Sequence, residues 1–253
     1  EEVTSASVIN LGKLKIKFFD ITHAIPDAIG VIIETPYGNV IYPGDFRFEL
    51  DENSNPVNIE HYEKLGKENN LVLFLESTNA ETPGFSIPEK VVYQNLEKIV
   101  TEAKNRIIIG MFSSHIERVI EIVKVAEKHD KKVAIDGYSL KASFEIVKAL
   151  GYFHPKKDVL IPVEKIDSYL PSKVIAICTG SQGEENASLM RIANKRHKHI
   201  RITKDDTVIL SSSVIPGNEK SIQSLKDNLS RQGAKIIHYG VASVHASGHA
   251  CQE

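Results

Sequence analysis

Apolar residues follow two different patterns along the chain, and the change falls near residue 80. Before it, short runs rich in β-branched and aromatic residues predict strands at residues 14–19, 29–34, 39–42 and 71–75. The Thr-Pro-Tyr-Gly sequence at 35–38 predicts a hairpin turn between the second and third of these. The first part of the chain is therefore predicted to be rich in β-structure.

From Ile87 onward, apolar residues with helical spacing alternate with short β-branched runs. The runs predict strands at residues 106–111, 132–135, 173–178, 207–210 and 235–238, with helices between them. One helix is expected at 115–128, where apolar and charged residues take opposite faces, and another at 140–150, ended by Gly151. This alternation favours a parallel sheet wrapped by helices.

Composition narrows the class of protein without naming it. The chain has 253 residues, of which 42% are hydrophobic, enough to bury one large core or two smaller ones. The 31 basic and 33 acidic residues nearly cancel, so net charge argues neither for nor against nucleic acid. Cys178 and Cys251 lack CxxC spacing, which fits a reduced cytosol and disfavours a disulfide scaffold or zinc ribbon. No apolar run reaches the roughly 18 residues of a membrane span.

Polar, small residues follow three of the predicted parallel strands. These loops are Ser113–His115, Thr179–Glu184 and the serines at 211–213 with Pro216–Asn218. Ligands of such sheets gather beyond the carboxyl ends of the strands, and backbone N–H groups and hydroxyls there suit phosphate oxygens. The alternative is that these residues serve only as ordinary caps and turns.

Two further groups of residues are candidates for a catalytic, anion-binding or metal site. His245 and His249 flank a Ser-Gly step, where imidazoles can converge and the backbone can approach an anion. His23 and Asp45 are metal-ligand types, but each stands alone in its segment. The alternative is that the histidines are ordinary surface or core residues and that His23 and Asp45 simply end strands.

Taken together, five segments resemble the ribonuclease J family, enzymes of the metallo-β-lactamase fold with an inserted β-CASP domain. The segments are Thr22–Asp27, Gly44–Phe46, Glu76–Glu81, Cys178–Glu184 and His245–Ala250. The resemblance spans the whole chain and implies an α/β fold: a partial metallo-β-lactamase αββα core plus a β-CASP domain with a mainly parallel sheet flanked by helices. The implied domains are a partial lactamase domain at 1–79, the β-CASP domain at 80–240 and the start of a return to the lactamase domain at 241–253.

The same resemblance implies roles for four residues. His23 looks like a metal ligand and Asp45 like the carboxylate that bridges two divalent metal ions, with zinc expected and manganese or magnesium as alternatives. His249 is expected to act in catalysis on a phosphate oxygen or leaving group, and Glu76 to orient a histidine or a ligand beside it.

RNA is the implied partner, and its expected contacts fall in three parts of the chain. They are His245, Ser247, Gly248, Ala250, Ser181, Ser114 and Arg118. The segment Ser113–Arg118 departs from the family's Ala-Ser-Asn-Ile-His-Arg pattern, because His115 replaces Asn and Glu117 replaces His. A basic cluster of Arg191, Lys195, Arg196 and Lys198 either tracks an RNA backbone or is a solvated helix end.

The family's principal His-x-His-x-Asp-His motif does not occur in this sequence. The chain is therefore expected to be an internal portion of a cytoplasmic ribonuclease that acts 5′ to 3′ and internally in rRNA processing and mRNA decay. Such enzymes form homodimers or homotetramers, and this portion alone is expected to be inactive, with its metal ions incompletely ligated. The alternatives are a non-catalytic RNA-binding module of the same fold and a β-CASP nuclease that acts on other nucleic acids.

Overall fold

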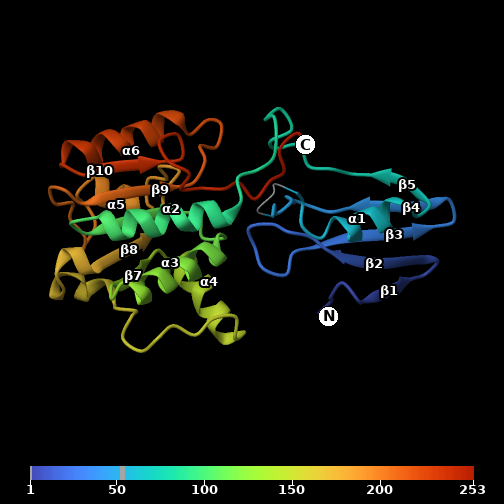
Figure 1. Cartoon of the computed structure of the whole chain (residues 1–253), viewed down its shortest axis with the longest axis horizontal. Coiled ribbons are helices and arrows are strands. Elements are labelled where there is room, and N and C mark those ends of the chain that lie inside the picture. Colours follow the sequence, from blue (N-terminus) through green and yellow to red (C-terminus); the bar gives the residue numbers. More distant parts are fainter. Residues whose placement is uncertain (1, 52–54) are drawn as a thin grey trace. The chain divides into compact units, whose positions relative to one another are not determined.

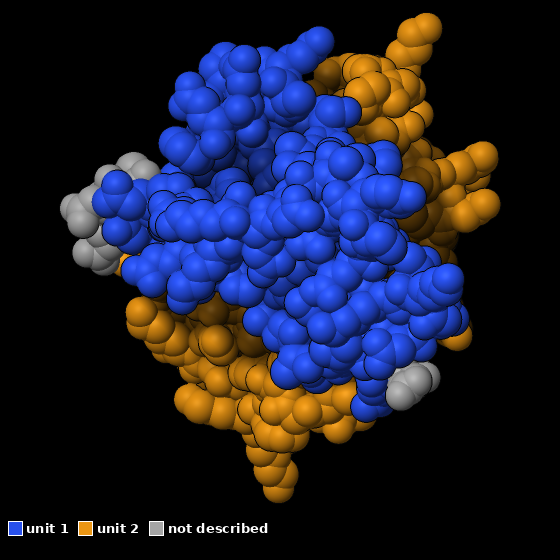
Figure 2. Space-filling view, turned by 90° about the vertical axis from the view of Figure 1, so that its right-hand side faces the viewer, with its two compact units in different colours: residues 1–88, 247–253 blue, residues 89–246 orange. Residues whose placement is uncertain are grey.

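The chain folds into two compact units. The computed structural model describes residues 2–51 and 55–253. Unit 1 comprises the residues up to Pro88 together with Ser247–Glu253, and unit 2 comprises Glu89–Ala246; Figure 2 colours them separately. Both ends of the chain thus belong to unit 1, and unit 2 is an insertion.

Unit 1 is built on a five-stranded sheet in the order β1-β2-β3-β4-β5. The strands are β1 (Val8–Leu11), β2 (Leu14–Asp20), β3 (Ile29–Thr35), β4 (Gly38–Tyr42) and β5 (Asn70–Leu73). The first four pair antiparallel and β5 joins β4 in parallel, after helix α1 (Ile59–Gly66). The four strands expected from the sequence are present, whereas β1 and α1 were not predicted.

The core of unit 1 is small. Its buried apolar residues are Phe19, Ile32 and Ile41. Gly30 faces the Phe19 ring so closely that a Cβ there would lie 2.3 Å from it, so the strand needs glycine at this point. The apolar run Leu71–Leu75 is exposed along its whole length.

Unit 2 is a parallel sheet in the order β10-β9-β6-β8-β7, which confirms the predicted fold class. Strands β7, β8, β9 and β10 are labelled in Figure 1. Its strands are β6 (Ile107–Met111), β7 (Lys132–Asp136), β8 (Val174–Cys178), β9 (Thr207–Ser211) and β10 (Lys235–His238). The helices are α2 (Glu89–Glu102), α3 (Ile116–Lys128), α4 (Tyr138–Ala149), α5 (Ser188–Ala193) and α6 (Glu219–Arg231), with 3₁₀ turns η1 (Val163–Ser168) and η2 (Pro171–Lys173). Among the described residues, no helix has the length and apolarity needed to cross a membrane.

Alternate residues of each strand in unit 2 enter different cores. In β6, Ile107 and Ile109 pack with α2, α3 and α4, whereas Ile108 packs with α5, α6 and η1. Both faces of the sheet are thus covered, which explains why these strands are continuous apolar runs rather than alternating ones. Helix α4 ends as expected, with Gly151 at a φ of 80° and its N–H bonded to the carbonyl of Lys148 at 3.1 Å.

The two units divide at 88/89 and 246/247, later than the expected boundaries at 79/80 and 240/241. Residues 80–88 remain with unit 1 because Thr82 O accepts from Gln252 N at 2.9 Å and Ser86 Oγ bonds to His249 O at 2.7 Å. Residues 241–246 remain with unit 2 because Arg118 binds Ala246 O. The composition of these linkers gave no sign of such long-range contacts.

Asp136, at the carboxyl end of β7, is a buried charged residue that the sequence did not single out. Its Oδ2 accepts hydrogen bonds from Ser188 Oγ at 2.5 Å and from His197 Nε2 at 2.9 Å, and Lys141 lies 3.3 Å from Oδ1. Burial opposes ionisation, but the hydrogen bonds from His197 and Ser188 outweigh it and hold the pKa of Asp136 well below its ordinary value. The carboxylate joins β7 to α5 and to the segment that follows it.

Asp136 should make the stability of unit 2 sensitive to acid. Because the pKa of this carboxyl is lower in the folded than in the unfolded chain, its contribution is complete above about pH 4 to 5 and is lost as the pH falls further. Asp136→Asn should cost roughly 1–3 kcal/mol at pH 7 and flatten the dependence on pH. Urea unfolding of both chains from pH 7 to pH 3 measures this, and parallel curves would contradict it.

Candidate functional site

Three segments that carry predicted site residues lie together in unit 1. Thr22 and Arg47 form an antiparallel bridge, with the N–H of Arg47 donating to Thr22 O at 2.8 Å. This bridge places the segment of His23 beside that of Asp45. The N–H of Ala250 donates to Phe46 O at 2.6 Å, which adds residues 247–250 to the group.

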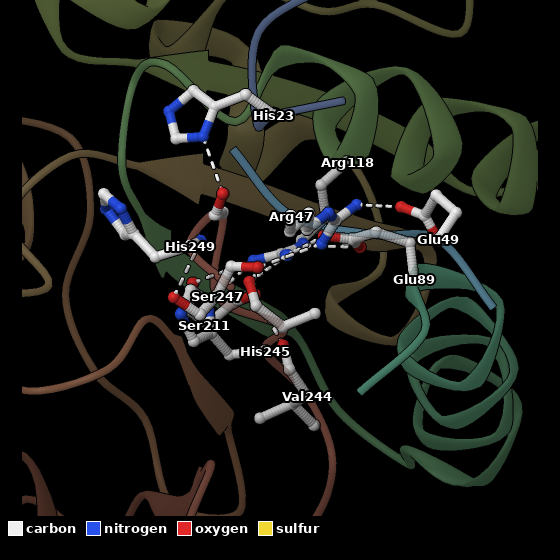
Figure 3. A network of polar contacts seen from close by, with 12 residues as sticks. His23, Arg47, Glu49, Glu89, Arg118, Ser211, Val244, His245, Ser247 and His249 are labelled. Carbon is white, nitrogen blue, oxygen red and sulfur yellow. Dashed lines mark hydrogen bonds and ion pairs between the residues drawn. The ribbon is translucent and has the colours of Figure 1, made fainter. Parts of the chain in front are cut away.

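His23 is held in a defined orientation. Its Nδ1 lies 2.7 Å from the carbonyl oxygen of Gly248 (Figure 3). A carbonyl oxygen only accepts, so Nδ1 carries the proton and Nε2 keeps its lone pair when the ring is neutral. A Cβ on residue 248 would lie 2.7 Å from the His23 ring, so this approach requires glycine.

Glu76 and His249 form a hydrogen-bonded pair. His249 Nδ1 lies 2.9 Å from Glu76 Oε1, and the Glu76 side chain is 9% exposed. Burial would raise the pKa of Glu76, but hydrogen bonds from Thr78 and the charge and hydrogen bond of His249 outweigh burial and keep that pKa below its ordinary value. The ionised carboxylate only accepts, so Nδ1 of His249 carries a proton. The carboxylate thereby fixes the ring and leaves Nε2 for another partner.

Residues 247–249 are further held by three side chains. Asn79 Nδ2 donates to Ser247 Oγ at 3.0 Å and to His249 O at 3.3 Å. Ser86 Oγ donates to His249 O at 2.7 Å, and Arg47 donates to Ser247 O at 3.1 Å. The hydroxyl of Ser247 also accepts from the His249 N–H at 3.2 Å. The segment is therefore preorganised.

The residues present fit a metal centre only in part. His23 offers Nε2, and its Nδ1 bond to a carbonyl is the usual support for a ligating imidazole. Asp45 is exposed in a bend after β4. No group of three or more His, Cys, Asp or Glu side chains in residues 2–51 and 55–253 is arranged to hold a metal ion. Within these residues, His23 and Asp45 therefore do not belong to a complete metal site.

The three loops predicted to lie at one sheet edge do so, because they follow the adjacent strands β8, β6 and β9. Gln182 joins two of them: its Nε2 donates to Ser213 O at 2.6 Å and its Oε1 accepts from Ile215 N at 2.9 Å. Ser181 is buried beside a hollow of about 20 Å³ that Ser212 and Lys226 also line. The hollow can hold a water molecule but not a phosphate group.

His245 and Ser114 differ in what they offer a ligand. Ser114 is exposed in the turn before α3. His245 is buried, stacks on His115 with ring centroids 5.3 Å apart, and has Nδ1 2.9 Å from Arg118 Nη1. Arginine only donates, so Nδ1 of His245 is an acceptor in this bond.

Arg118 is turned inward, which corrects its expected part in RNA binding. Its side chain is 1% exposed, forms an ion pair with Glu89, and donates to the carbonyls of Ser211 at 3.3 Å and Ala246 at 3.1 Å (Figure 3). These bonds occupy the guanidinium, so Arg118 does not present its charge to a ligand. It instead ties the first and last residues of unit 2 to α3.

Comparison with known proteins agrees with this architecture. The family model described as "Ribonuclease J, beta-CASP domain" matches residues 104–229. A crystal structure of an Enterococcus faecalis protein of unknown function aligns with 98% of this chain and 56% of its own, with a TM-score of 0.65 and 14% identity, and so shares the fold. The parallel sheet and the match to the family model define unit 2 as a β-CASP domain.

Similar sequences are found in longer proteins. Ribonuclease J of Mycoplasma pneumoniae is 37% identical over 94% of this chain, and ribonuclease J 1 of Streptococcus pyogenes is 37% identical over 100% of it. Ribonuclease J 2 of Staphylococcus aureus is 35% identical over 99%. The chain belongs to the ribonuclease J family. It spans 42% to 45% of the length of these relatives, in agreement with the expectation that it is an internal portion of a longer protein.

The sequence did not reveal the residues that support the site. Asn79, Ser86 and Arg47 hold residues 247–249 across 163 to 200 positions of sequence. Asn79 stands in a motif that carried the resemblance, whereas Ser86 and Arg47 stand in none. Only the fold brings them to the segment.

Proposed function

We propose that this chain is part of a metal-dependent ribonuclease that hydrolyses phosphodiester bonds of RNA, both from the 5′ end and internally. The observation that carries the proposal is the Glu76–His249 pair, with Nδ1 of His249 2.9 Å from the carboxylate. The names of the relatives supply the substrate class.

In this proposal His249 either donates a proton to the leaving oxygen or stabilises a phosphate oxygen. With Nδ1 bonded to Glu76, Nε2 is the atom that reaches the scissile phosphate or the leaving oxygen. Glu76 is a positioning residue that acts through the imidazole. Its lowered pKa keeps it ionised at neutral pH, so the orientation of the ring persists under ordinary conditions.

We further assign His23 Nε2 and the carboxylate of Asp45 as ligands of two divalent metal ions, with the remaining ligands outside the described residues. Zinc is favoured by the imidazole, and manganese or magnesium also accept a carboxylate. Such ions, when bound, lower the pKa of a coordinated water and stabilise negative charge at phosphorus. The bond from His23 to Gly248 O ties this ligand to the segment that carries His249.

RNA contacts are assigned to two surfaces. In unit 1 they come from Ser247, Gly248 and Ala250, beside His249. In unit 2 they come from the loop edge at Ser114 and Ser181, with His245 acting through its packing rather than by direct contact. Ser181 has no preformed phosphate pocket, so its share rests on backbone N–H groups of the loop.

The test uses a longer protein that contains this chain and RNA labelled at its 3′ end. We expect RNA with a 5′-monophosphate to decay faster than RNA with a 5′-triphosphate, and a chelator to stop decay of both. The isolated 253-residue chain should cleave neither. Undiminished decay in the presence of the chelator would contradict metal dependence. Equal decay of both RNAs would contradict the preference for a 5′-monophosphate. Cleavage of DNA alone would contradict the assignment of RNA as the substrate.

A further inference from the structure

Basic residues gather in one short stretch of unit 2. Between residues 191 and 204 the chain has six Lys or Arg residues and no Asp or Glu, although its net charge is −2. All six side chains are exposed. Arg191 lies 3.7 Å from the carboxylate of Asp136, so its charge already has a partner. The other five are Lys195, Arg196, Lys198, Arg201 and Lys204.

The end of α6 and the start of β10 add two more cations to this surface. Asn228 Nδ2 donates to Asn194 Oδ1 at 3.1 Å, and the N–H of Asp205 donates to Gly233 O at 3.0 Å. These bonds place residues 228–235 against residues 194–205. The combined surface, named the basic edge, consists of Lys195, Arg196, Lys198, Arg201, Lys204, Arg231 and Lys235.

The basic edge extends to the amino ends of the parallel strands through Arg201, Lys204 and Lys235, whereas Lys195, Arg196 and Lys198 flank His197, which bonds to Asp136 at the carboxyl end of β7. Lys204 comes just before β9, and Lys235 is the first residue of β10. The loops that carry Ser114 and Ser181 follow the carboxyl ends of the strands, at the opposite edge. A five-residue strand spans roughly 17 Å, so Arg201, Lys204 and Lys235 lie at the opposite edge of the sheet from Ser114 and Ser181.

The charges of the basic edge are available to a partner. Among the described residues, none of its seven side chains forms an ion pair. Of the neighbouring acids, Asp206 is buried and lies 3.0 Å from Arg106, and Asp205 is exposed. Two more exposed acids face other side chains: Glu164 lies 4.0 Å from His199 and Asp167 lies 3.6 Å from Arg106. The large apolar side chains exposed in the described part of the chain include none from residues 193–204 or 228–236.

We infer that the basic edge binds the phosphate backbone of single-stranded RNA without reading its sequence, as a contact surface of unit 2 additional to the loops of Ser114 and Ser181. Exposed cations without an apolar centre suit a polyanion, whereas the core of a protein interface is apolar and aromatic. The choice of RNA as the polyanion rests on the proposed function. The surface holds RNA by charge alone, so its affinity falls steeply with salt.

The test measures binding of a labelled 30-nucleotide oligouridine to the 253-residue chain in a chelator. The variant Lys198→Gln/Arg201→Gln/Lys204→Gln should bind about tenfold more weakly at low salt, and the slope of log affinity against log salt should shrink by about 2, roughly 0.7 for each phosphate contact. The control variant Lys13→Gln/Lys124→Gln/Lys157→Gln removes the same charge from other exposed sites and should bind within twofold of the parent.

Three outcomes decide the inference. Equal loss in both variants would show an effect of net charge only and overturn it. Unchanged RNA binding with weakened binding of polyglutamate would overturn it in favour of an acidic protein partner. Loss of RNA binding confined to the basic-edge variant supports it, even if the longer protein cleaves no RNA, because binding is measured without catalysis.

Discussion

Replacing His249 with alanine in a longer protein that contains this chain should slow RNA hydrolysis about 10²- to 10⁴-fold, the usual contribution of a positioned acid or base. The physical reason is the loss of Nε2, the ring atom that Glu76 leaves unengaged by binding Nδ1. RNA affinity should change little, because the hydrogen bonds that hold the backbone of residues 247–250 do not involve the His249 side chain. Single-turnover cleavage and binding in a chelator separate the two effects.

Glu76→Gln provides the companion variant. The amide keeps the size of the side chain but removes its charge, and its NH₂ group can donate to Nδ1 and so favour the wrong tautomer. We expect a smaller loss than for His249→Ala, and the double variant should be no worse than His249→Ala alone, because both residues act through one ring.

A matched control lies in unit 2. His129 Nε2 is 2.7 Å from Glu97 Oε1, so His129→Ala removes a similar histidine–carboxylate pair far along the chain from the motif residues. It should leave the cleavage rate within twofold. Unchanged cleavage by His249→Ala, or equal slowing by His129→Ala, would contradict a catalytic role for His249.

The strands of unit 2 were predictable because they are buried on both faces. Each is a short β-branched run bounded by polar residues, and the observed bounds of β6 to β10 differ from the expected ones by no more than one residue at either end. Strand β1 escaped prediction because, although three of its four residues are apolar, the run is too short to show a period, and most of its residues are exposed. Helix α1 escaped because it is only eight residues long, so Ile59, Tyr62 and Leu65 give too short an apolar pattern to mark a helix.

The candidate site, like the fold, was predictable from the sequence only in part. Motif resemblance pointed to Glu76 and His249, which the fold brings to 2.9 Å, but no sequence pattern states that distance. Arg118 was expected at a ligand because its segment resembles the family's pattern, and arginine side chains are seldom fully buried. Its burial depends on Glu89, Ser211 and Ala246, which lie 29 to 128 positions away, so it follows from tertiary packing alone.

Arg118→Met should lower the free energy of unfolding of unit 2 by roughly 3–5 kcal/mol, the cost of breaking a buried ion pair by removing one partner. The change removes the Arg118 cation from the Glu89 carboxylate, which is 12% exposed. It also takes donors from the carbonyls of Ser211 and Ala246. Urea unfolding of the 253-residue chain, followed by circular dichroism, gives the difference.

Two further variants separate the charge from the hydrogen bonds. Arg118→Lys keeps the positive charge, but its compact ammonium cannot bond Glu89, Ser211 and Ala246 together, so an intermediate loss is expected. Arg118→Met/Glu89→Gln should recover part of the loss, because no buried charge remains unpaired. Arg231→Met, at an exposed arginine, should stay within about 0.5 kcal/mol of the parent.

Arg118 also holds the last residues of unit 2, which lead into the motif segment His245–Ala250. Residues 244–246 are held in unit 2 by Arg118 and by Ser211 Oγ, which donates to Val244 O at 2.6 Å, and the next residue is Ser247. Hydrogen exchange in Arg118→Met should therefore quicken first at residues 244–246, below the concentration of urea that unfolds the unit. Uniform quickening throughout unit 2 would instead assign Arg118 a purely global role in stability.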